Sequence, residues 1–443
     1  MKSLYIKTYG CQMNVYDSVK MADLLKPYGF GIVDSPEHAD MVILNTCHIR
    51  EKAAEKVYSE LGRMAKIKRA REKNGDSMVI AVAGCVAQAE GEEVIRRAPF
   101  VDIVVGPQSY QDLPVLLEET RRKKSWVLNL ELKENSKFDQ LAPDSGSQGY
   151  SAFLSVQEGC NKFCRYCVVP YTRGAEYSRP VADIYNEALR IIDGGSVEIT
   201  LLGQNINAYH GNGPNGNVWS LGRLIKYLAS IEGLQRIRYT TSHPKDMTDE
   251  ELFYAHATES KLMPFIHLPI QSGSDVILKA MNRRYNVGFY ISIIEKFRKI
   301  KPDIAFSSDF IVGYPGETEE DFIATMQLVE HVNYAHAYSF KYSPRPGTPA
   351  SVLPSQIPED IKSERLARLQ SLLCKQQLNF NQAKVGQVLR ILVENQGRSG
   401  SQMMGKSPYM QSIIIDDGSK LFGKFVDVKI TSAAQNSLKG HKF

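Results

Sequence analysis

The sequence predicts an α/β protein in three parts: an N-terminal doubly wound parallel sheet, a central run of six βα units and a small C-terminal β-barrel. Short runs rich in Val and Ile alternate with charged amphipathic stretches through most of the chain. The last part differs, because it contains only short strands separated by Gly-bearing turns. At 443 residues the chain also exceeds what one hydrophobic core ordinarily supports.

The N-terminal part, which we place at residues 1–125, has the pattern of βαβ units. Its apolar runs are bounded by Gly, Asp or Pro and are separated by helical segments such as residues 51–71. We predict strands at residues 4–8, 30–33, 41–44, 78–83 and 101–105. A polar stretch containing Pro143-Asp144-Ser145-Gly146 follows, and we predict a linker at residues 126–149.

The central part, which we place at residues 150–378, repeats strand and helix six times. We predict strands at residues 153–157, 197–202, 236–241, 265–270, 304–311 and 335–342. Helical stretches follow them, among them residues 181–192, 220–230 and 319–332. Six such units form either a closed sheet or a partial barrel, and the pattern alone does not distinguish the two.

The C-terminal part, which we place at residues 380–443, follows a long predicted helix. Short strands are expected at residues 388–394, 412–415 and 424–430. Strands of this length with Gly-bearing turns indicate a small β-barrel of the oligonucleotide-binding kind.

The C-terminal part is also where the positive charge lies. Between Asn381 and Phe443 nine Lys and Arg side chains oppose four Asp and Glu, so this segment carries the whole formal net charge of +5. A basic domain suits a polyanion such as nucleic acid. A solvated basic surface has the same composition, and charge alone does not separate the two readings.

The cysteines point to metal chemistry. The chain starts with strand-like alternation and has no apolar run near the roughly 18 residues that span a bilayer, so we expect a cytoplasmic protein. In that reducing compartment cysteines bind metals or act in catalysis more often than they form disulfides. Six of the seven form two groups of three, and Cys374, in a Leu-rich helical stretch, is expected to be a packed thiol.

The first group, the N-terminal trio, is Cys11, Cys47 and Cys85. Each cysteine comes just after a predicted strand and just before a predicted helix. The carboxyl ends of parallel strands share one edge, where doubly wound folds bind ligands, and a helix N-terminus favours a thiolate. We therefore expect the three thiols to converge on one ligand, an iron–sulfur cluster. Three separately buried thiols are the alternative, and a zinc site would need a fourth ligand such as His48.

The second group, the loop trio, is Cys160, Cys164 and Cys167. Its C-x3-C-x2-C spacing lies directly after the first strand of the central part. Three thiolates in eight residues can bind three irons of a four-iron cluster and leave the fourth iron open to a ligand. Zinc motifs of this size use paired cysteines with a second pair downstream, which this sequence lacks.

With these motifs the sequence resembles the radical S-adenosylmethionine (SAM) methylthiotransferases over essentially the whole chain. The matching segments are residues 8–14 (TYGCQMN), 44–47 (LNTC), 168–174 (VVPYTRG), 201–205 (LLGQN), 241–244 (TSHP), 267–274 (HLPIQSGS), 313–318 (GYPGET) and 341–348 (KYSPRPGT). The resemblance implies that the central part is the partial (β/α)6 barrel of radical SAM enzymes and that the C-terminal part is a TRAM domain.

The resemblance implies two [4Fe-4S] clusters and SAM as cofactors. The loop trio's cluster would bind SAM and reduce it to a 5′-deoxyadenosyl radical. The N-terminal trio's cluster would supply sulfur, and a second SAM the methyl group. The implied substrate is C2 of N6-isopentenyl adenosine next to the anticodon of a tRNA. An external electron donor and a monomeric enzyme are also implied.

Two other reactions of the family keep all six cysteine ligands. They are methylthiolation of a threonylcarbamoyl adenosine in tRNA and of an aspartate in a ribosomal protein. The basic C-terminal part favours RNA over a protein substrate. An RNA-binding electron carrier is a further reading, but such carriers ordinarily bind every iron through protein ligands. A zinc-containing RNA-binding module is the weakest of the readings.

Further candidate residues surround the two trios. For Tyr166, between two loop cysteines, the resemblance implies stacking on the cofactor's adenine, and a packed core tyrosine is the alternative. Polar side chains near the carboxyl ends of the central strands are candidates for SAM contacts. They are Gln204, Gln271, Asp309 and Glu317.

Three basic residues are candidates for substrate contacts. Arg345, between two prolines after the sixth central strand, suits a phosphate or another substrate group. In the C-terminal part, Lys406 and Lys424 are expected to contact the phosphates of the anticodon stem.

Overall fold

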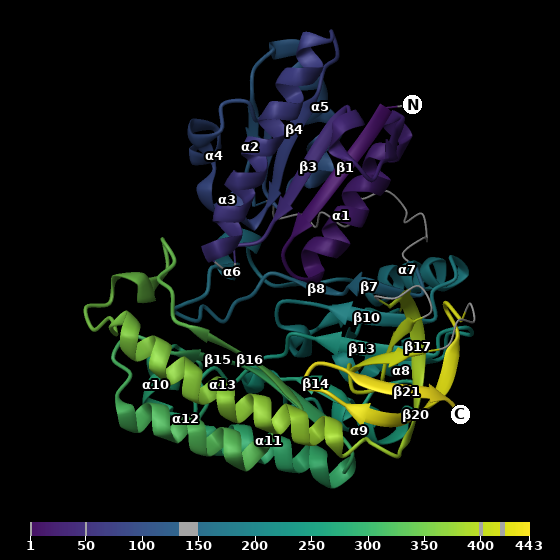
Figure 1. The fold of residues 1–443 in the computed structure, drawn as a ribbon, viewed down its shortest axis with the longest axis vertical. Coiled ribbons are helices and arrows are strands. Elements are labelled where there is room, and N and C mark those ends of the chain that lie inside the picture. The colour runs from purple at the N-terminus through teal and green to yellow at the C-terminus, as the bar shows by residue number, and fades with distance from the viewer. Residues whose placement is uncertain (1, 49–50, 133–148, 398–401, 417–420) are drawn as a thin grey trace. The chain divides into compact units, whose positions relative to one another are not determined.

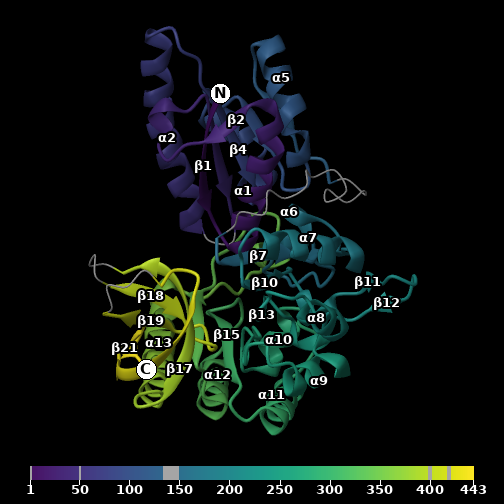
Figure 2. The same ribbon diagram turned by 90° about the vertical axis from the view of Figure 1, so that its right-hand side faces the viewer.

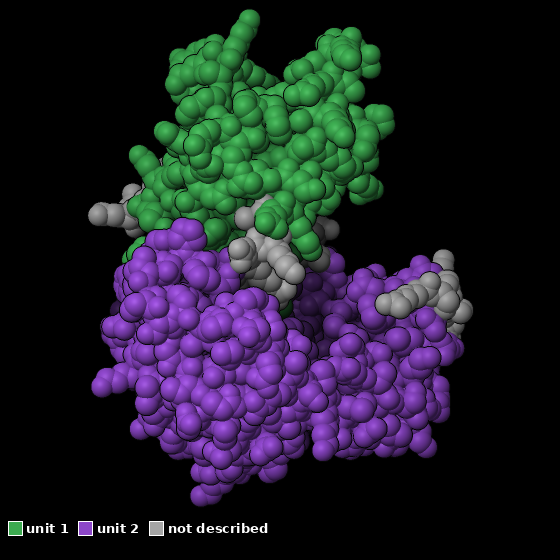
Figure 3. Space-filling view, turned by 60° about the vertical axis from the view of Figure 1, so that its left-hand side comes forward, with its two compact units in different colours: residues 1–145, 157–161, 168–179 green, residues 146–156, 162–167, 180–443 purple. Residues whose placement is uncertain are grey.

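The computed structural model describes residues 2–48, 51–132, 149–397, 402–416 and 421–443. Two compact units are distinguished in Figure 3, the first formed by residues 1–145, 157–161 and 168–179 and the second by residues 146–156, 162–167 and 180–443. Each unit is described by itself. In the described ranges no helix combines the length and the apolar character that crossing a membrane requires.

The first unit is built on a six-stranded, fully parallel sheet with strand order β2-β1-β3-β4-β5-β6. The strands are β1 (Lys2–Tyr9), β2 (Phe30–Ile32), β3 (Met41–Thr46), β4 (Val79–Gly84), β5 (Ile103–Val105) and β6 (Val127–Asn129). The helices are α1 (Gln12–Leu25), α2 (Glu51–Lys73), α3 (Cys85–Glu90), α4 (Glu92–Arg97), α5 (Leu113–Lys123) and α6 (Val169–Arg173). A short antiparallel pair, β8 (Gln157–Glu158) and β9 (Tyr177–Ser178), belongs to the same unit.

Helices cover both faces of this sheet, so the predicted doubly wound fold is confirmed. Figure 2 shows α2 and α5 on opposite sides of the sheet. Side chains of α1 and α5 form a core with one face, and side chains of α2, α3 and α4 form a second core with the other. Successive residues of β4 enter the two cores alternately, Ala81 and Ala83 on one side, Ile80 and Val82 on the other. This explains the continuous apolar runs in the sequence, because strands buried on both faces have no polar alternation.

Strand β6 was not among the strands that the sequence predicts. It pairs with β5 and falls within the range we assigned to the linker, residues 126–149. A three-residue edge strand gives a weak apolar signal, which explains why the pattern missed it. The remainder of that range, residues 133–148, lies outside the described residues.

The second unit contains six parallel strands in two three-stranded sheets (Figure 1). The first sheet has the order β13-β10-β7 and the second β14-β15-β16, and a parallel bridge between Ile237 and Leu262 leads from one to the other. The strands are β7 (Ser151–Ser155), β10 (Glu198–Leu202), β13 (Arg236–Thr240), β14 (Phe265–His267), β15 (Ala305–Val312) and β16 (His336–Lys341). No ladder among the described residues joins β16 to β7, so the sheet is a partial barrel.

The helices of this unit pack around one large apolar core with the six strands. They are α7 (Val181–Asp193), α8 (Leu221–Ala229), α9 (Glu250–Thr258), α10 (Asp275–Ala280), α11 (Val287–Ile300), α12 (Glu319–Val332) and α13 (Glu359–Gln382). A small hairpin of β11 (Gly211–Asn212) and β12 (Val218–Trp219) lies between β10 and α8 in the chain.

The C-terminal part is a closed barrel with strand order β17-β18-β19-β21-β20. The strands are β17 (Val388–Gln396), β18 (Met403–Lys406), β19 (Ser412–Ile415), β20 (Phe425–Ala433) and β21 (Leu438–Lys442). The sequence predicted the barrel but only three of its strands. Strands β18 and β21 each contain a glycine, Gly405 and Gly440, which weakens the strand pattern. In the barrel a Cβ at Gly405 would lie 2.3 Å from the carbonyl oxygen of Leu392, so the close strand approach requires the glycine.

Two buried arginines of β13 hold the barrel against the second unit's sheet. Arg236 donates to the carbonyl oxygens of Lys406 (3.0 Å) and Arg390, and Arg238 donates to those of Ser407 and Pro408, both at 2.8 Å. The two guanidinium groups share the buried carboxylate of Glu198.

Candidate functional site

The first unit brings the N-terminal trio to one edge of its sheet. Cys11, Cys47 and Cys85 follow β1, β3 and β4, which are neighbours in the strand order. The register pairs Tyr9 with Thr46, and Thr46 with Gly84, so the strands end side by side.

The relation of the trio to helices is less uniform than the sequence predicts. Cys11 caps α1 and Cys85 is the first residue of α3, but α2 begins at Glu51, four positions after Cys47. The helix-terminus effect on a thiolate therefore applies to two of the three cysteines.

Two glycines make room for these thiols. A Cβ at Gly10 would lie 2.4 Å from Oδ1 of Asn14 and 2.6 Å from Cβ of Cys47, distances at which atoms clash. Gly84 has a φ of +92°, and a Cβ there would lie 2.3 Å from the carbonyl oxygen of Thr46. Both positions therefore require glycine.

A buried pair of asparagines connects the first two cysteine positions. Asn14 Oδ1 accepts from the amide and the thiol of Cys11, both at 3.4 Å, and its Nδ2 donates to Asn45 Oδ1 at 3.1 Å. Asn14 Nδ2 also reaches the carbonyl oxygen of Thr46, the residue before Cys47. The pair thus fixes the turn after β1 against the end of β3.

The thiol of Cys11 has a lowered pKa. A hydrogen bond from Cys47 is the largest cause, and the positive charge of Arg173 contributes, so the pKa of Cys11 falls to about 6 although burial opposes this. The thiolate, which is the form that binds metals, is therefore favoured near neutral pH. Three thiols that follow neighbouring strands at one sheet edge, one of them with a lowered pKa, fit an iron–sulfur cluster.

Arg173, the last residue of α6, lies in a buried ion network, and its charge acts on Cys11 and Cys85 of the trio. Its guanidinium is 2.7 Å from a carboxylate oxygen of Asp17 and 2.7 Å from one of Glu158, and all three side chains are almost fully buried. Tyr110 donates to Asp17 at 2.8 Å, and Gln108 donates to Glu158 at 3.0 Å. Burial alone would lower the pKa of Arg173, but the charges around it raise it well above the usual value. Arg173 is therefore a permanent cation with two anionic partners.

The loop trio lies on the segment between β8 and α6. Cys164 is buried, and Cys160 and Cys167 are half-buried. The amide of Cys167 donates to the carbonyl oxygen of Cys164 at 2.9 Å, and the amide of Cys160 donates to that of Gly174 at 3.2 Å. Asn282 fixes the turn from outside, because its Nδ2 donates to the carbonyl oxygen of Phe163 at 2.9 Å.

A second buried arginine, Arg283, lies next to this loop. It precedes α11, and its Nη1 is 3.5 Å from Sγ of Cys164 and 3.3 Å from the hydroxyl of Tyr166. The predicted cofactor-stacking residue Tyr166 is thus held by Arg283, and it packs on a small apolar core that contains Met281 and Tyr314.

Two glutamines predicted to contact the cofactor follow strands of the second unit. Gln204 is half-buried two residues after β10. Gln271 is buried, has a φ of +82° and forms an isolated parallel bridge with Phe310 of β15. A glutamine in this conformation is strained, and such strain is concentrated at functional sites.

The two acidic candidates have different surroundings. Asp309 in β15 lies 3.5 Å from Nε2 of His267 and remains partly exposed. Glu317 is buried in an ion pair with Arg365 at 2.8 Å and accepts from the amide of Gly313 at 2.9 Å. Glu317 therefore has structural partners, whereas Asp309 still faces solvent.

The basic candidates also differ. Arg345 is half-buried, and its carbonyl oxygen accepts from the amide of Thr348. Lys406 donates to Ser412 at 2.8 Å, and burial lowers its pKa. Lys424, just before β20, is exposed.

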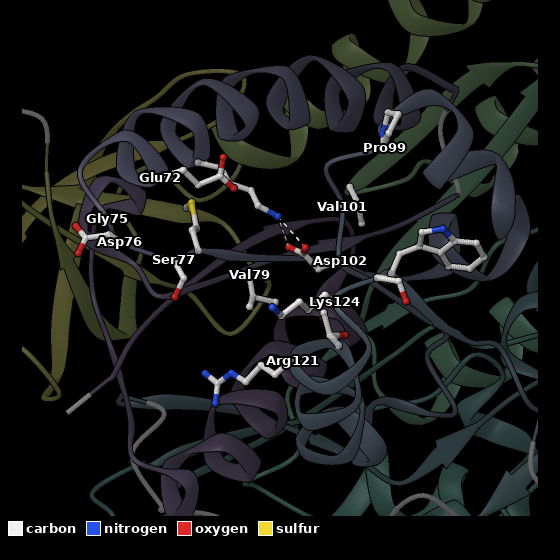
Figure 4. A pocket seen from close by; sticks show the side chains of 15 residues that line it. Glu72, Gly75, Asp76, Ser77, Val79, Pro99, Val101, Asp102, Arg121 and Lys124 are labelled. Carbon is white, nitrogen blue, oxygen red and sulfur yellow. Dashed lines mark hydrogen bonds and ion pairs between the residues drawn. The ribbon is translucent and has the colours of Figure 1, made fainter.

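The first unit also has a hollow at the opposite edge of its sheet (Figure 4). Its volume is about 630 Å³, and residues just before β4, β5 and β6 line it. Lys68 in this hollow is paired with Asp102 at 2.7 Å. Because it lies at the amino ends of these strands, it is separate from the cysteine edge.

Sequence reasoning did not assign a role to Arg173 or Arg283. Arg173 is part of the matching segment at residues 168–174, and this segment was the feature of the sequence that could have pointed to it. Arg283 is one of two adjacent arginines, Arg283 and Arg284, and nothing in the sequence distinguishes the buried one from the exposed one.

Comparisons with known families match three consecutive parts of the chain. Residues 3–106 match the uncharacterized protein family UPF0004, residues 154–329 the radical SAM superfamily and residues 382–443 the TRAM domain.

Curated relatives match over nearly their whole length. The tRNA-2-methylthio-N(6)-dimethylallyladenosine synthase of Wolbachia pipientis subsp. Culex pipiens is 61% identical, with 99% of both chains covered. The protein of the same name from Rickettsia felis is 58% identical, again with 99% of both chains covered.

Solved structures share the fold at low identity. The radical SAM methyltransferase TsrM from Kitasatospora setae has a TM-score of 0.58 at 11% identity, covering 80% of this chain and 77% of that one. The cobalamin-dependent radical SAM enzyme OxsB has a TM-score of 0.55 at 12% identity, covering 84% of this chain and 56% of that one.

Proposed function

The chain belongs to the radical SAM methylthiotransferase family that contains the tRNA-2-methylthio-N(6)-dimethylallyladenosine synthases, and we propose that it carries out the reaction this name describes. It places a methylthio group on C2 of N6-isopentenyl adenosine next to the anticodon of a tRNA. The observation that carries this proposal is the combination of both cysteine trios with the basic C-terminal barrel in a chain that matches these relatives from end to end.

Both trios are suited to a [4Fe-4S] cluster that keeps one iron free of protein ligands. When bound, the loop trio's cluster supplies the electron that converts SAM to a 5′-deoxyadenosyl radical, and the N-terminal trio's cluster supplies sulfur. The chain's own residues prepare these sites. Asn14 and Asn45 fix the first site, and Arg283 contacts Cys164 at the second.

Other parts of the proposal concern the partners. SAM is the source of both the radical and the methyl group, and Tyr166, Gln204, Gln271 and Asp309 are the candidates for its contacts. Lys424 and Arg345 are candidates for contacts with the tRNA. Phosphate contacts of the barrel give a salt-dependent affinity. We further propose a monomer that works in the cytoplasm with an external electron donor.

A loop base next to the anticodon is a favourable substrate for this chemistry. It is single-stranded, so turning it out of its stack costs less than it would in a duplex. The two other family reactions, on threonylcarbamoyl adenosine or on a ribosomal protein aspartate, are not favoured, because the relatives named above carry the isopentenyl-adenosine name.

The test is an anaerobic assay with reconstituted protein, SAM, dithionite and tRNA that carries isopentenyl adenosine. Mass spectrometry of the nucleosides should show the 2-methylthio product. Cys160→Ala and Cys47→Ala should each abolish it. Cys374→Ala is the matched control, because this thiol belongs to neither trio, and it should keep the activity.

Two results would contradict parts of the proposal. Formation of 5′-deoxyadenosine without modified tRNA would retain the radical chemistry but reject the substrate. Full activity of Cys47→Ala would reject the role of the N-terminal trio.

A further inference from the structure

Arg283 is a buried cation beside the loop trio. Its side chain is 4% exposed, and all of its nitrogens donate hydrogen bonds. Nε reaches the hydroxyl of Tyr285 at 2.9 Å, and Nη2 reaches the carbonyl oxygen of Pro269 at 2.5 Å. Nη1 is shared between the hydroxyl of Tyr166 at 3.3 Å and Sγ of Cys164 at 3.5 Å.

No carboxylate within the described part of the chain forms an ion pair with Arg283. Its other partners are two neutral phenols and a carbonyl oxygen, so Cys164 is the one group in contact with it that becomes an anion when it binds metal. Burying a guanidinium without an anion is costly. The arrangement is therefore complete only when negative charge is present at the loop trio.

Tyr285 holds the guanidinium in this direction. Its hydroxyl accepts from Nε of Arg283 and donates to the carbonyl oxygen of Ile270 at 2.9 Å. With Pro269 accepting from Nη2, two contacts fix the plane of the guanidinium and direct Nη1 at the sulfur of Cys164.

We propose that Arg283 is a positioning residue for the loop trio's iron–sulfur cluster. Its guanidinium donates a hydrogen bond to Cys164 Sγ and raises the reduction potential of the cluster. The inference rests on the proposed function in one respect, that the loop trio holds such a cluster. Arg283 transfers neither an electron nor a proton.

The physical reason is the charge of the reduced cluster. One-electron reduction by the external donor adds a negative charge, and a fixed cation with a hydrogen bond to a ligand sulfur stabilises the reduced form more than the oxidised form. Without Arg283 the cluster would be harder to reduce, although its three protein ligands are unchanged.

The experiment is a redox titration monitored by electron paramagnetic resonance. The full-length chain carries alanine at the N-terminal trio, so that only the loop trio's cluster contributes, and iron and sulfide are quantified first. In Arg283→Met we expect an assembled cluster whose ratio of reduced to oxidised form is about tenfold lower at the same potential, a shift of about 59 mV to more negative values. Arg283→Lys, which retains the charge but not the fork of nitrogens, should show a smaller shift.

The matched control is Arg284→Met, since this neighbouring guanidinium is exposed and contacts Asn282 rather than a cysteine. The reduction potential of the loop trio's cluster should not change in Arg284→Met. An Arg283→Met chain with a complete cluster and an unchanged potential would overturn the proposal.

If the Arg283→Met chain folds but binds no iron, its iron content is compared with that of Arg283→Lys. Recovery of the cluster in Arg283→Lys would support the requirement for a cation, and failure to recover it would contradict the proposal. None of these measurements uses tRNA. The expected shift, together with formation of 5′-deoxyadenosine but no modified tRNA by the unsubstituted chain, would reject the proposed substrate and leave the role of Arg283 intact.

Discussion

The two cysteine trios are assembled in opposite ways. The N-terminal trio comes from the ends of three neighbouring strands, and the sheet register brings together residues far apart in the sequence. The loop trio lies within eight consecutive residues, so its proximity is a property of the sequence. The first site therefore depends on the whole unit being folded, whereas the second depends on one loop.

The two buried arginines differ as well. Arg173 has two carboxylates at 2.7 Å, and Arg283 has none in the described part of the chain. A neutralised guanidinium holds segments of the first unit together, since it connects α6 with α1 and β8. A guanidinium without a carboxylate partner, as at Arg283, is available to the cluster that we propose at the loop trio. We therefore assign Arg173 a role in the stability of the first unit, and Arg283 an electrostatic role at the loop trio.

The largest effect is expected from Gly10→Ala, which tests the assembly of the N-terminal trio. The added Cβ would clash with Asn14 and Cys47, so this site should lose its cluster while the loop trio keeps its own. Iron analysis after anaerobic reconstitution should fall from about eight to about four irons per chain. Gly62→Ala in α2, where nothing lies within 4 Å, is the control and should retain both clusters. Loss of both clusters in Gly10→Ala would show that the two sites are not independent.

The second-largest effect is expected from Arg173→Met, which tests whether the arginine with two carboxylate partners stabilises the first unit. The variant leaves Asp17 and Glu158 buried without their cation, and we expect the first unit to lose about 3–5 kcal/mol of stability. Hydrogen exchange of the α1 amides, followed by mass spectrometry, measures this loss. Arg96→Met removes an exposed ion pair with Glu93 and should change stability by less than about 0.5 kcal/mol. Equal protection of the α1 amides from hydrogen exchange in Arg173→Met and Arg96→Met would contradict a structural role for Arg173.

The smallest effect is expected from Lys424→Ala, which extends the comparison to the barrel. Lys424 is exposed, whereas Lys406 is half-buried and donates to Ser412. Lys424→Ala should weaken tRNA binding slightly and reduce the slope of log affinity against log salt by about 0.7 to 0.9. Lys406→Ala should change that slope less. Titrations at several salt concentrations measure both, and a larger change for Lys406 would reverse the assignment of the phosphate contact.

Much of the fold was visible in the sequence because its signals are local. Runs rich in Val and Ile indicated the strands of the parallel sheets, and eleven of the twelve parallel strands described in the two units were predicted close to their observed positions. The short edge strand β6 and the glycine-containing β18 and β21 were missed, because their stability comes from pairing with neighbours rather than from their own pattern.

The sequence by itself determined the grouping of six cysteines into two trios, the order of the three domains and the basic character of the last one, since spacing, periodicity and charge are properties of the chain. The tertiary structure decided which polar side chains have partners. It paired Glu317 with Arg365, surrounded Arg173 with carboxylates and directed Arg283 rather than Arg284 at Cys164. These contacts join residues up to 156 positions apart, and burial, which sets their energy, exists only once the chain has folded.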